Sequence, residues 1–307
     1  MKIMLIKHLS HIALFSIGTA ALTPAAFAQN FEETHLTELK ADGPETGKSA
    51  HKLIQKAFGK KSIETPDLYA SNHTKTPHII EGVDEIVGPH FLFLAHRDDD
   101  QDRDKGATDR QRNEIKIYDK SKRKLKGYEG ETVQYRWKFK IDDGFEFSKN
   151  FTHFFQIKAK NLSKSPASKD SDQFPVITFT GSESGDAGLV FQLRHSPSLD
   201  ENGKRVKFSK LVEQDMSRFT GQWIEFFVQT TYQDHGQLIV QAKNIETGEM
   251  LIDFQDDNID MWRGESRQDF ARPKWGIYRS LKNKDSLRSQ EETARFADFS
   301  IRKGTLN

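Results

Sequence analysis

Cysteine is absent from this chain of 307 residues, and it has little net charge and no long apolar run beyond its first residues. Without cysteine there can be no disulfide framework, no thiolate chemistry and no lipid-attached cysteine. The 46 lysines and arginines nearly balance the 45 aspartates and glutamates, whereas nucleic-acid-binding domains are usually strongly basic. No segment after residue 28 is apolar enough to span a bilayer. These absences argue against a disulfide-stapled module, a nucleic-acid partner and a membrane anchor.

The first 28 residues have the pattern of a secretory signal peptide. Lys2 and Lys7 form a basic start, residues 12–22 are apolar, and Ala26-Phe27-Ala28 matches an A-x-A cleavage site. Removing this segment leaves 44 basic against 45 acidic residues, a net charge of −1. We therefore expect export to the periplasm or the medium of a Gram-negative cell, with no membrane anchor on the mature chain.

Residues 29–76 are polar and are predicted to form an N-terminal extension on a larger body. Its one good helical pattern covers residues 49–58, where apolar residues recur at helical spacing and Gly59 could end the helix. Residues 77–307 are predicted to form a single domain.

That domain is rich in short aromatic and β-branched segments separated by Gly, Asp, Asn and Ser, which is typical of strands joined by turns. About ten strands without interleaved helices predict an all-β, two-sheet antiparallel sandwich of the jelly-roll type. Polar stretches at 163–172 and 281–292 are long enough to border a cleft. The predicted strands cover 91–95, 110–116, 133–141, 151–159, 176–180, 189–195, 223–231, 237–242, 274–279 and 295–301.

Charged and polar residues alternate with mostly apolar ones in several of these strands. Successive side chains of a strand point to opposite faces, so each strand offers one polar face. If the strands are neighbours, these faces form a cationic surface with a phenol, which would suit a polyanion, and Glu114 could relieve its repulsion by holding a guanidinium. The alternative is a solvated, salt-bridged edge strand. The polar faces consist of Arg110, Arg112, Glu114 and Lys116; Gln156 and Lys158; Gln192 and Arg194; and Lys274, Gly276 and Tyr278.

Three of these strands resemble the signature strands of jelly-roll polysaccharide lyases. Arg-Asn-Glu-Ile-Lys at 112–116, Gln-Ile-Lys at 156–158 and Lys-Trp-Gly-Ile-Tyr at 274–278 are similar to R-S-E-L-R, Q-I-H and Y-F-K-A-G-x-Y-x-Q of the alginate lyases, in the same order. The stretches 223–240 and 295–301 are more similar to the heparin-lyase and glucuronan-lyase group. The resemblance covers about residues 78–303.

The resemblance implies β-elimination on a uronic-acid-containing anionic polysaccharide, with carbohydrate degradation as the outcome. Such a reaction must neutralise the uronate carboxylate, remove the C5 proton and protonate the departing O4. By analogy, Arg112 and Gln156 contact the carboxylate, and Tyr278 donates to the leaving oxygen and could also act as base. Lys274 and Arg112 would favour its anion. The alternative for Tyr278 is a tyrosine of the hydrophobic core.

Two departures from the family pattern leave the base open. Lys158 stands where the alginate lyases have histidine, so it is either a carboxylate clamp or a lysine base with a depressed pKa. His153 and His195 are the other candidates, although simple alternation places both on the opposite face unless a bulge intervenes. Ser280 stands where the family motif ends in glutamine, which removes one expected substrate contact.

Other features are weaker. Asp98, Asp100 and Asp102 could bind calcium, but their spacing fails the EF-hand loop and a solvated acidic loop is the alternative. No cofactor is required for the predicted reaction. Arg97 could reach the cleft as a substrate contact. We expect a monomer. The main alternative to a lyase is a non-catalytic carbohydrate-binding sandwich. A glycoside hydrolase is the third and less favoured function, because no laminarinase-type pair of carboxylates is present.

Overall fold

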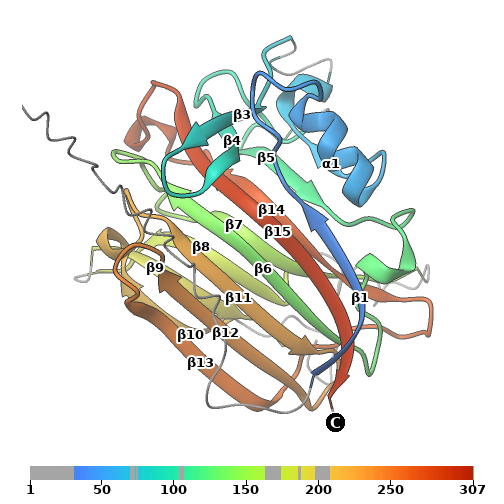
Figure 1. Ribbon diagram of the computed structural model, residues 1–307. Helices are drawn as coiled ribbons and strands as arrows, with labels where there is room; N and C mark the ends of the chain where they lie inside the picture. Colours follow the sequence, from blue (N-terminus) through green and yellow to red (C-terminus); the bar gives the residue numbers. More distant parts are fainter. Residues whose placement is uncertain are drawn as a thin grey trace, which may run out of the picture.

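The computed structural model describes residues 31–69, 73, 75–103, 107–162, 174–185, 188–197 and 208–306. The predicted signal peptide at 1–28 and the predicted loop at 163–172 lie outside the described residues. Two antiparallel sheets pack face to face (Figure 1), which confirms the predicted all-β sandwich of the jelly-roll type. Within the described part of the chain, no helix is long and apolar enough to cross a membrane.

The first sheet has eight strands in the order β13-β12-β11-β6-β15-β4-β3, and β1 also pairs with the long strand β15. Its strands are β1 (Phe31–Leu39), β3 (Ile79–Asp84), β4 (Gly88–Ala95), β6 (Thr132–Ile141), β11 (Ile224–Thr231), β12 (Gly236–Asn244), β13 (Met250–Ile259) and β15 (Glu292–Leu306).

The second sheet has seven strands in the order β10-β9-β8-β7-β14-β5-β2. Its strands are β2 (Ile63–Glu64), β5 (Arg110–Lys116), β7 (Thr152–Lys160), β8 (Ile177–Glu183), β9 (Leu189–His195), β10 (Ser209–Asp215) and β14 (Phe270–Ser280). Short 3-10 turns lie at Pro66–Leu68, Arg123–Leu125, Met216–Arg218 and Lys284–Ser286.

The single α-helix described, α1 (Ala50–Phe58), agrees with the helix predicted at 49–58. It buries Ala50, Ile54 and Phe58 and ends at Gly59, whose backbone N–H bonds to the carbonyl of Gln55. The stretch predicted as an extension does more than pack on the body. It contributes β1 to one sheet (Figure 1). It also contributes β2, which pairs with β5, to the other sheet, so the sandwich begins before residue 77.

The core lies between the sheets and is strongly aromatic. On β6, Tyr135, Trp137 and Phe139 are buried while the intervening residues are half-buried, as expected of a strand with one face on the core. Trp137 stacks on Phe226 of β11 at 5.2 Å and on Phe155 of β7 at 4.6 Å between ring centroids. Burial of these large rings fixes the strand parity, and the polar residues of the second sheet are consequently turned away from the core.

Candidate active site

The three signature strands are neighbours in the second sheet, in the order β7-β14-β5. Lys274 lies opposite Lys116, Gly276 opposite Glu114, and Tyr278 opposite Arg112. The polar faces predicted from alternation therefore merge into one surface. Gly276 permits this close pairing, because its φ is +136° and a Cβ there would lie 2.1 Å from the carbonyl oxygen of Asn113.

A β-bulge in β7 brings His153 onto the same surface. Against β8 the register shifts between His153 and Phe155, and against β14 it shifts between Trp275 and Tyr278, which pair with Phe155 and His153. Phe154 and Phe155 are both buried in the aromatic core. Two consecutive residues thus face inward, and His153 joins Gln156 and Lys158 on the polar face. The bulge that would turn His153 to the polar face, which the sequence left open, is therefore present.

A cavity of about 300 Å³ lies over the β7, β8 and β9 part of this surface and reaches β5 and β14. It contains most of the residues predicted from sequence and several that were not. The predicted residues that line it are Arg110, Arg112, His153, Gln156, Lys158, Arg194, His195 and Tyr278. The remaining lining residues are Asn150, Phe151, Phe174, Pro175, Thr178, Ser196 and Phe208.

Tyr278 is half-buried at the wall of the cavity rather than in the core. Its hydroxyl accepts a hydrogen bond of 3.0 Å from Nη1 of Arg110, and the guanidinium of Arg112 lies 3.7 Å from the centre of its ring. Arg110 is itself held by Asp109, with two bonds of 2.7 Å. Since the hydroxyl oxygen already accepts from Arg110, its own proton is available for donation into the cavity.

His153 presents a neutral imidazole. Its Nδ1 lies 2.8 Å from the hydroxyl of Thr180, which donates its proton to Thr178 at 2.9 Å. Thr180 must then accept from Nδ1–H, which leaves Nε2 with a lone pair. Burial, followed by the positive charges of Arg194 and Arg112, lowers the pKa of His153 well below its usual value. The imidazole lies 6.0 Å from the Tyr278 ring, between centroids.

Lys158 lines the cavity and lies opposite Arg272 of β14. Burial lowers its pKa to about 7, and the nearby charges of Lys274 and Arg112 act in the same direction. Its amine is therefore close to half-protonated at neutral pH, and a carboxylate beside it would favour the ammonium form.

Glu114 is the centre of a buried group of ion pairs that we call the charge network: Glu64, Asp102 and Glu114 with Arg103, Arg112, Lys116 and Lys274. Its Oε2 accepts from Lys274 at 2.5 Å and from Arg112, and its Oε1 accepts from the Gln156 amide at 2.5 Å. The expectation that Glu114 holds a guanidinium is thus met by Arg112. The amide of Gln156 is likewise committed to Glu114.

Glu64 and Asp102 complete the charge network. Glu64 pairs with Lys116 at 2.6 Å, Lys274 at 2.9 Å and Arg103 at 3.1 Å. Burial alone would raise the pKa of Glu64, but Lys274 and Arg112 hold it well below its usual value. Asp102 accepts from Nε of Arg112 at 2.7 Å. The surface expected to be cationic is therefore largely neutralised at its β5 edge.

The remaining predicted residues fall into three places. Arg194 lines the cavity and donates to Gln192, and burial lowers its pKa to about 10. His195 also lines the cavity, and its Nε2 is 2.6 Å from the carbonyl oxygen of Asp260. Arg97 bonds to the Leu287 carbonyl at 2.7 Å and is not among the cavity-lining residues described.

The structure does not bring the three candidate calcium ligands together. Asp98 pairs with Arg97 at 2.7 Å, and Asp102 turns into the charge network. Asp100 is buried and lies 2.8 Å from Nε2 of His78. Each carboxylate is committed to a different partner, because the loop after β4 points successive aspartates in different directions.

Sequence reasoning missed several residues that shape the site. Glu64 lies in the stretch predicted as an extension, and only its pairing with Glu114 through β2 places it there. Thr180, which orients His153, had no motif. Phe151 stacks on His153 at 4.7 Å and lies 5.2 Å from Tyr278; as the first residue of a predicted strand it carried no distinct signal.

Comparison with known proteins identifies the fold. No family model and no curated protein sequence matches the chain. Among solved structures it resembles the endo-β-1,4-glucuronan lyase of the fungus Trichoderma reesei, with a TM-score of 0.53, 12% identity, and coverage of 89% of this chain and 96% of that one.

Two further solved structures are similar to the same extent. The PL-14 alginate lyase of Aplysia kurodai has a TM-score of 0.54 and 9% identity, over 86% of this chain and 97% of that one. A mutant of the alginate lyase Aly36B in complex with an alginate trisaccharide has a TM-score of 0.51 and 10% identity, over 88% and 99%. The chain thus has the jelly-roll fold found in polysaccharide lyases.

Proposed function

We propose that this protein is a polysaccharide lyase that cleaves a uronic-acid-containing polymer by β-elimination. The observation that supports this most strongly is the pair formed by His153 and Tyr278, whose ring centroids lie 6.0 Å apart. Both line a cavity that Lys158 and Arg194 also line. The solved structures with the same fold are named as glucuronan and alginate lyases, whose substrates are uronate polymers.

The reaction requires two proton transfers and no water. A base takes the C5 proton, the C5–H electron pair forms the C4=C5 double bond, and the C4–O4 bond breaks. An acid then protonates the departing oxygen. The developing negative charge spreads into the C5 carboxylate, so a cation beside that carboxylate lowers the barrier.

We assign the base to His153. Its pKa is lowered by burial and by nearby arginines, so it is neutral over the physiological range. Its Nδ1–H is held by Thr180, which directs the lone pair of Nε2 away from that contact. A neutral imidazole with one anchored nitrogen is ready to accept a proton.

We assign the carboxylate clamp to Lys158 rather than to Gln156, whose amide is bound by Glu114. With a pKa of about 7 in the empty cavity, Lys158 takes up a proton when an anionic carboxylate enters, and the resulting ion pair is formed in a buried setting. Arg112 is held by Asp102 and Glu114 and contributes through its charge.

We assign the acid to Tyr278. Its hydroxyl accepts from Arg110 and so donates its own proton to the leaving oxygen. The positive charges of Arg110 and Arg112 stabilise the phenolate left behind, and that phenolate is reprotonated from solvent or from protonated His153 before the next turnover.

A panel of uronate polymers tests the proposal. The mature protein is incubated with glucuronan, alginate, ulvan and a heparin-type polymer, and the ultraviolet absorbance of the unsaturated uronate is followed. We expect a rise on at least one polymer. Binding without any rise across the panel would identify a carbohydrate-binding module, and new reducing ends without the chromophore would identify a hydrolase.

We also propose that the protein is exported, on the basis of the sequence pattern at residues 1–28. Expression of the full chain in a Gram-negative host should yield periplasmic or extracellular protein whose N-terminal residue is Gln29. Recovery of the uncut chain from the cytoplasm would contradict this.

A further inference from the structure

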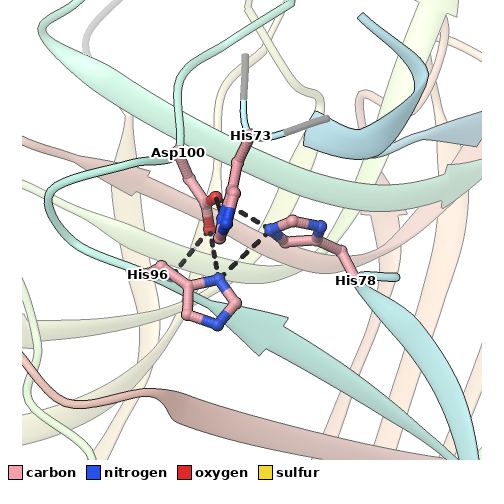
Figure 2. Close-up of side chains that lie close together, drawn as sticks. All are labelled: His73, His78, His96 and Asp100. Carbon is pink, nitrogen blue, oxygen red and sulfur yellow. Dashed lines mark hydrogen bonds and ion pairs between the residues drawn. The ribbon is translucent and has the colours of Figure 1, made fainter. Parts of the chain in front are cut away.

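Three histidines and an aspartate meet at the end of the β3-β4 hairpin, outside the cavity described above. His78 immediately precedes β3, His96 immediately follows β4, and Asp100 lies in the turn beyond it. His73 approaches from the segment before the hairpin, and the four side chains converge (Figure 2). One potential ligand atom from each lies within 4.8 Å of all the others.

The spacing of these atoms suits a small tetrahedral ion. The Oδ1 atom of Asp100 lies 2.8 Å from Nε2 of His78 and 3.4 Å from Nδ1 of His73. Nδ1 of His96 lies 3.2 Å from Nε2 of His78. Ligands of a tetrahedral zinc ion with bonds of ~2.0–2.1 Å are separated by about 3.4 Å.

The outer nitrogen of each imidazole lies beside an oxygen that can accept a hydrogen bond from it. Nδ1 of His78 lies 2.6 Å from the carbonyl oxygen of Thr76, and Nε2 of His96 lies 2.8 Å from the carboxylate of Glu291. Nε2 of His73 lies 3.1 Å from the Thr76 hydroxyl. Metal-binding histidines commonly donate their second N–H to such partners, which fixes the ring and its tautomer.

The inner nitrogens of His78 and His96 face Asp100 and each other. Nε2 of His78 lies 2.8 Å from Oδ1 of Asp100 and 3.2 Å from Nδ1 of His96. Without a metal, His78 donates from both nitrogens, to Thr76 and to Asp100, and a metal ion would replace the inner proton. Nδ1 of His73 is buried and has no hydrogen-bond partner within the described residues. A cation between these atoms would satisfy all of them at once.

We propose that His73, His78, His96 and Asp100 form a closed, four-coordinate site for a divalent transition metal, with zinc as the ion that fits best. Three imidazoles and one carboxylate suit zinc and not calcium, which takes six to eight oxygen ligands. With no position left for water or substrate, the site is structural.

The metal site braces the loop that supplies the charge network. Asp100 is anchored by the backbone N–H of His96 at 2.6 Å, and Asp102, two residues further on, holds Arg112. The side chain of Asn113 in β5 also donates to the carbonyl of His78 at 2.6 Å. Neither the geometry of the four ligands nor these contacts depend on lyase activity.

Zinc binding to the tag-free mature protein tests the inference directly. Protein stripped with a chelator is titrated with zinc sulfate by calorimetry, and the metal content after gel filtration is measured by mass spectrometry. We expect one zinc ion per chain, a higher thermal midpoint and no competition from calcium chloride. Cobalt(II) in place of zinc should give the intense visible bands of a tetrahedral site.

Two variants locate the ion. His96→Asn should abolish stoichiometric binding. Glu291→Gln changes only a half-exposed outer partner and should weaken zinc binding 10- to 100-fold, so it serves as the test even if His96→Asn does not fold. Glu85→Gln, an exposed carboxylate at the opposite end of the same hairpin, is the matched control and should bind as wild type.

Two results would overturn the inference. One is the absence of stoichiometric zinc on the wild-type protein, which would mean that a proton shared between His78 and Asp100 occupies the site. The other is zinc binding that Glu291→Gln leaves unchanged, which would place the ion elsewhere.

Discussion

The two ends of the polar surface are built from the same alternating strands yet differ in how their charges are compensated. At the β5 edge, Glu64, Asp102 and Glu114 each bind two or more cations in the charge network. Toward β7 and β9, Lys158 and Arg194 line a cavity, and burial lowers the pKa of both.

This difference indicates separate roles for the two ends: one holds side chains in position, and the other takes part in the reaction. Arg112 is held in place by the carboxylates of Asp102 and Glu114. Burial alone would lower its pKa, but Glu114 and Asp102 hold it well above its usual value. Cations with lowered pKa values are destabilised in the empty cavity and gain most from an incoming anion. We infer that the β5 edge holds Tyr278 in place while the β7 side receives the substrate carboxylate.

The largest effect is expected from removing the phenol proton. Tyr278→Phe keeps the ring beside Arg112 and should lower kcat by about 10²- to 10⁴-fold, because it removes the general acid. Initial rates on the best polymer measure this. Tyr128→Phe is the control, since Arg123 covers the Tyr128 ring at the same 3.7 Å and neither residue is among the cavity-lining residues described. Equal rates for both variants would refute the assignment.

The charge network should matter chiefly for stability. Glu114→Gln removes the carboxylate that Arg112 and Lys274 share, and breaking a buried ion pair costs about 3–5 kcal/mol of unfolding free energy. Urea denaturation measures the change. Glu249→Gln, in an exposed pair with Arg218 at 2.7 Å, should cost at most ~1 kcal/mol. A similar small loss for both would remove the distinction between the two ends.

Lys158 should give the reaction a characteristic pH dependence. Its pKa of about 7 in the free enzyme means that the ammonium form is lost as the pH rises through 7. A clamp needs that form, so kcat/KM should fall about tenfold per pH unit above 7. Lys158→Arg should abolish this alkaline limb. A kcat/KM that rises through pH 7 would instead make Lys158 the base.

The smallest effect concerns the orientation of His153. Thr180→Val removes the partner of Nδ1, and a neutral hydrogen bond is worth about 0.5–1.5 kcal/mol, so kcat should fall about 2- to 10-fold. Thr230→Val in the other sheet is the control, because its buried hydroxyl makes no hydrogen bond among the described residues. If kcat is unchanged in Thr180→Val, the threonine does not orient the base.

Strand parity explains why much of the fold and surface was predictable. Alternation on β6, with Tyr135 and Trp137 inward, is set by local burial and can be read from the sequence. The same reasoning correctly placed Arg110, Arg112 and Tyr278 together. The strands β10 and β13 were missed because they are rich in exposed polar residues and lack strong alternation.

The unpredicted part depends on contacts between distant segments. Phe154 and Phe155 are both apolar, so the sequence does not reveal that both face the core and turn His153 to the surface. Glu64 reaches Lys274 across more than two hundred residues of chain. Glu64 helps to neutralise the cations at the β5 edge through this long-range pairing. No local sequence pattern predicts such a contact.

Cleavage of the best uronate polymer in water labelled with oxygen-18 tests the central claim most directly. Elimination adds no water across the bond, so the mass spectrum of the initial products should show unsaturated oligosaccharides without label incorporated at the cleavage step. Saturated products that carry one labelled oxygen per cut would contradict the lyase mechanism and show that the groove supports hydrolysis.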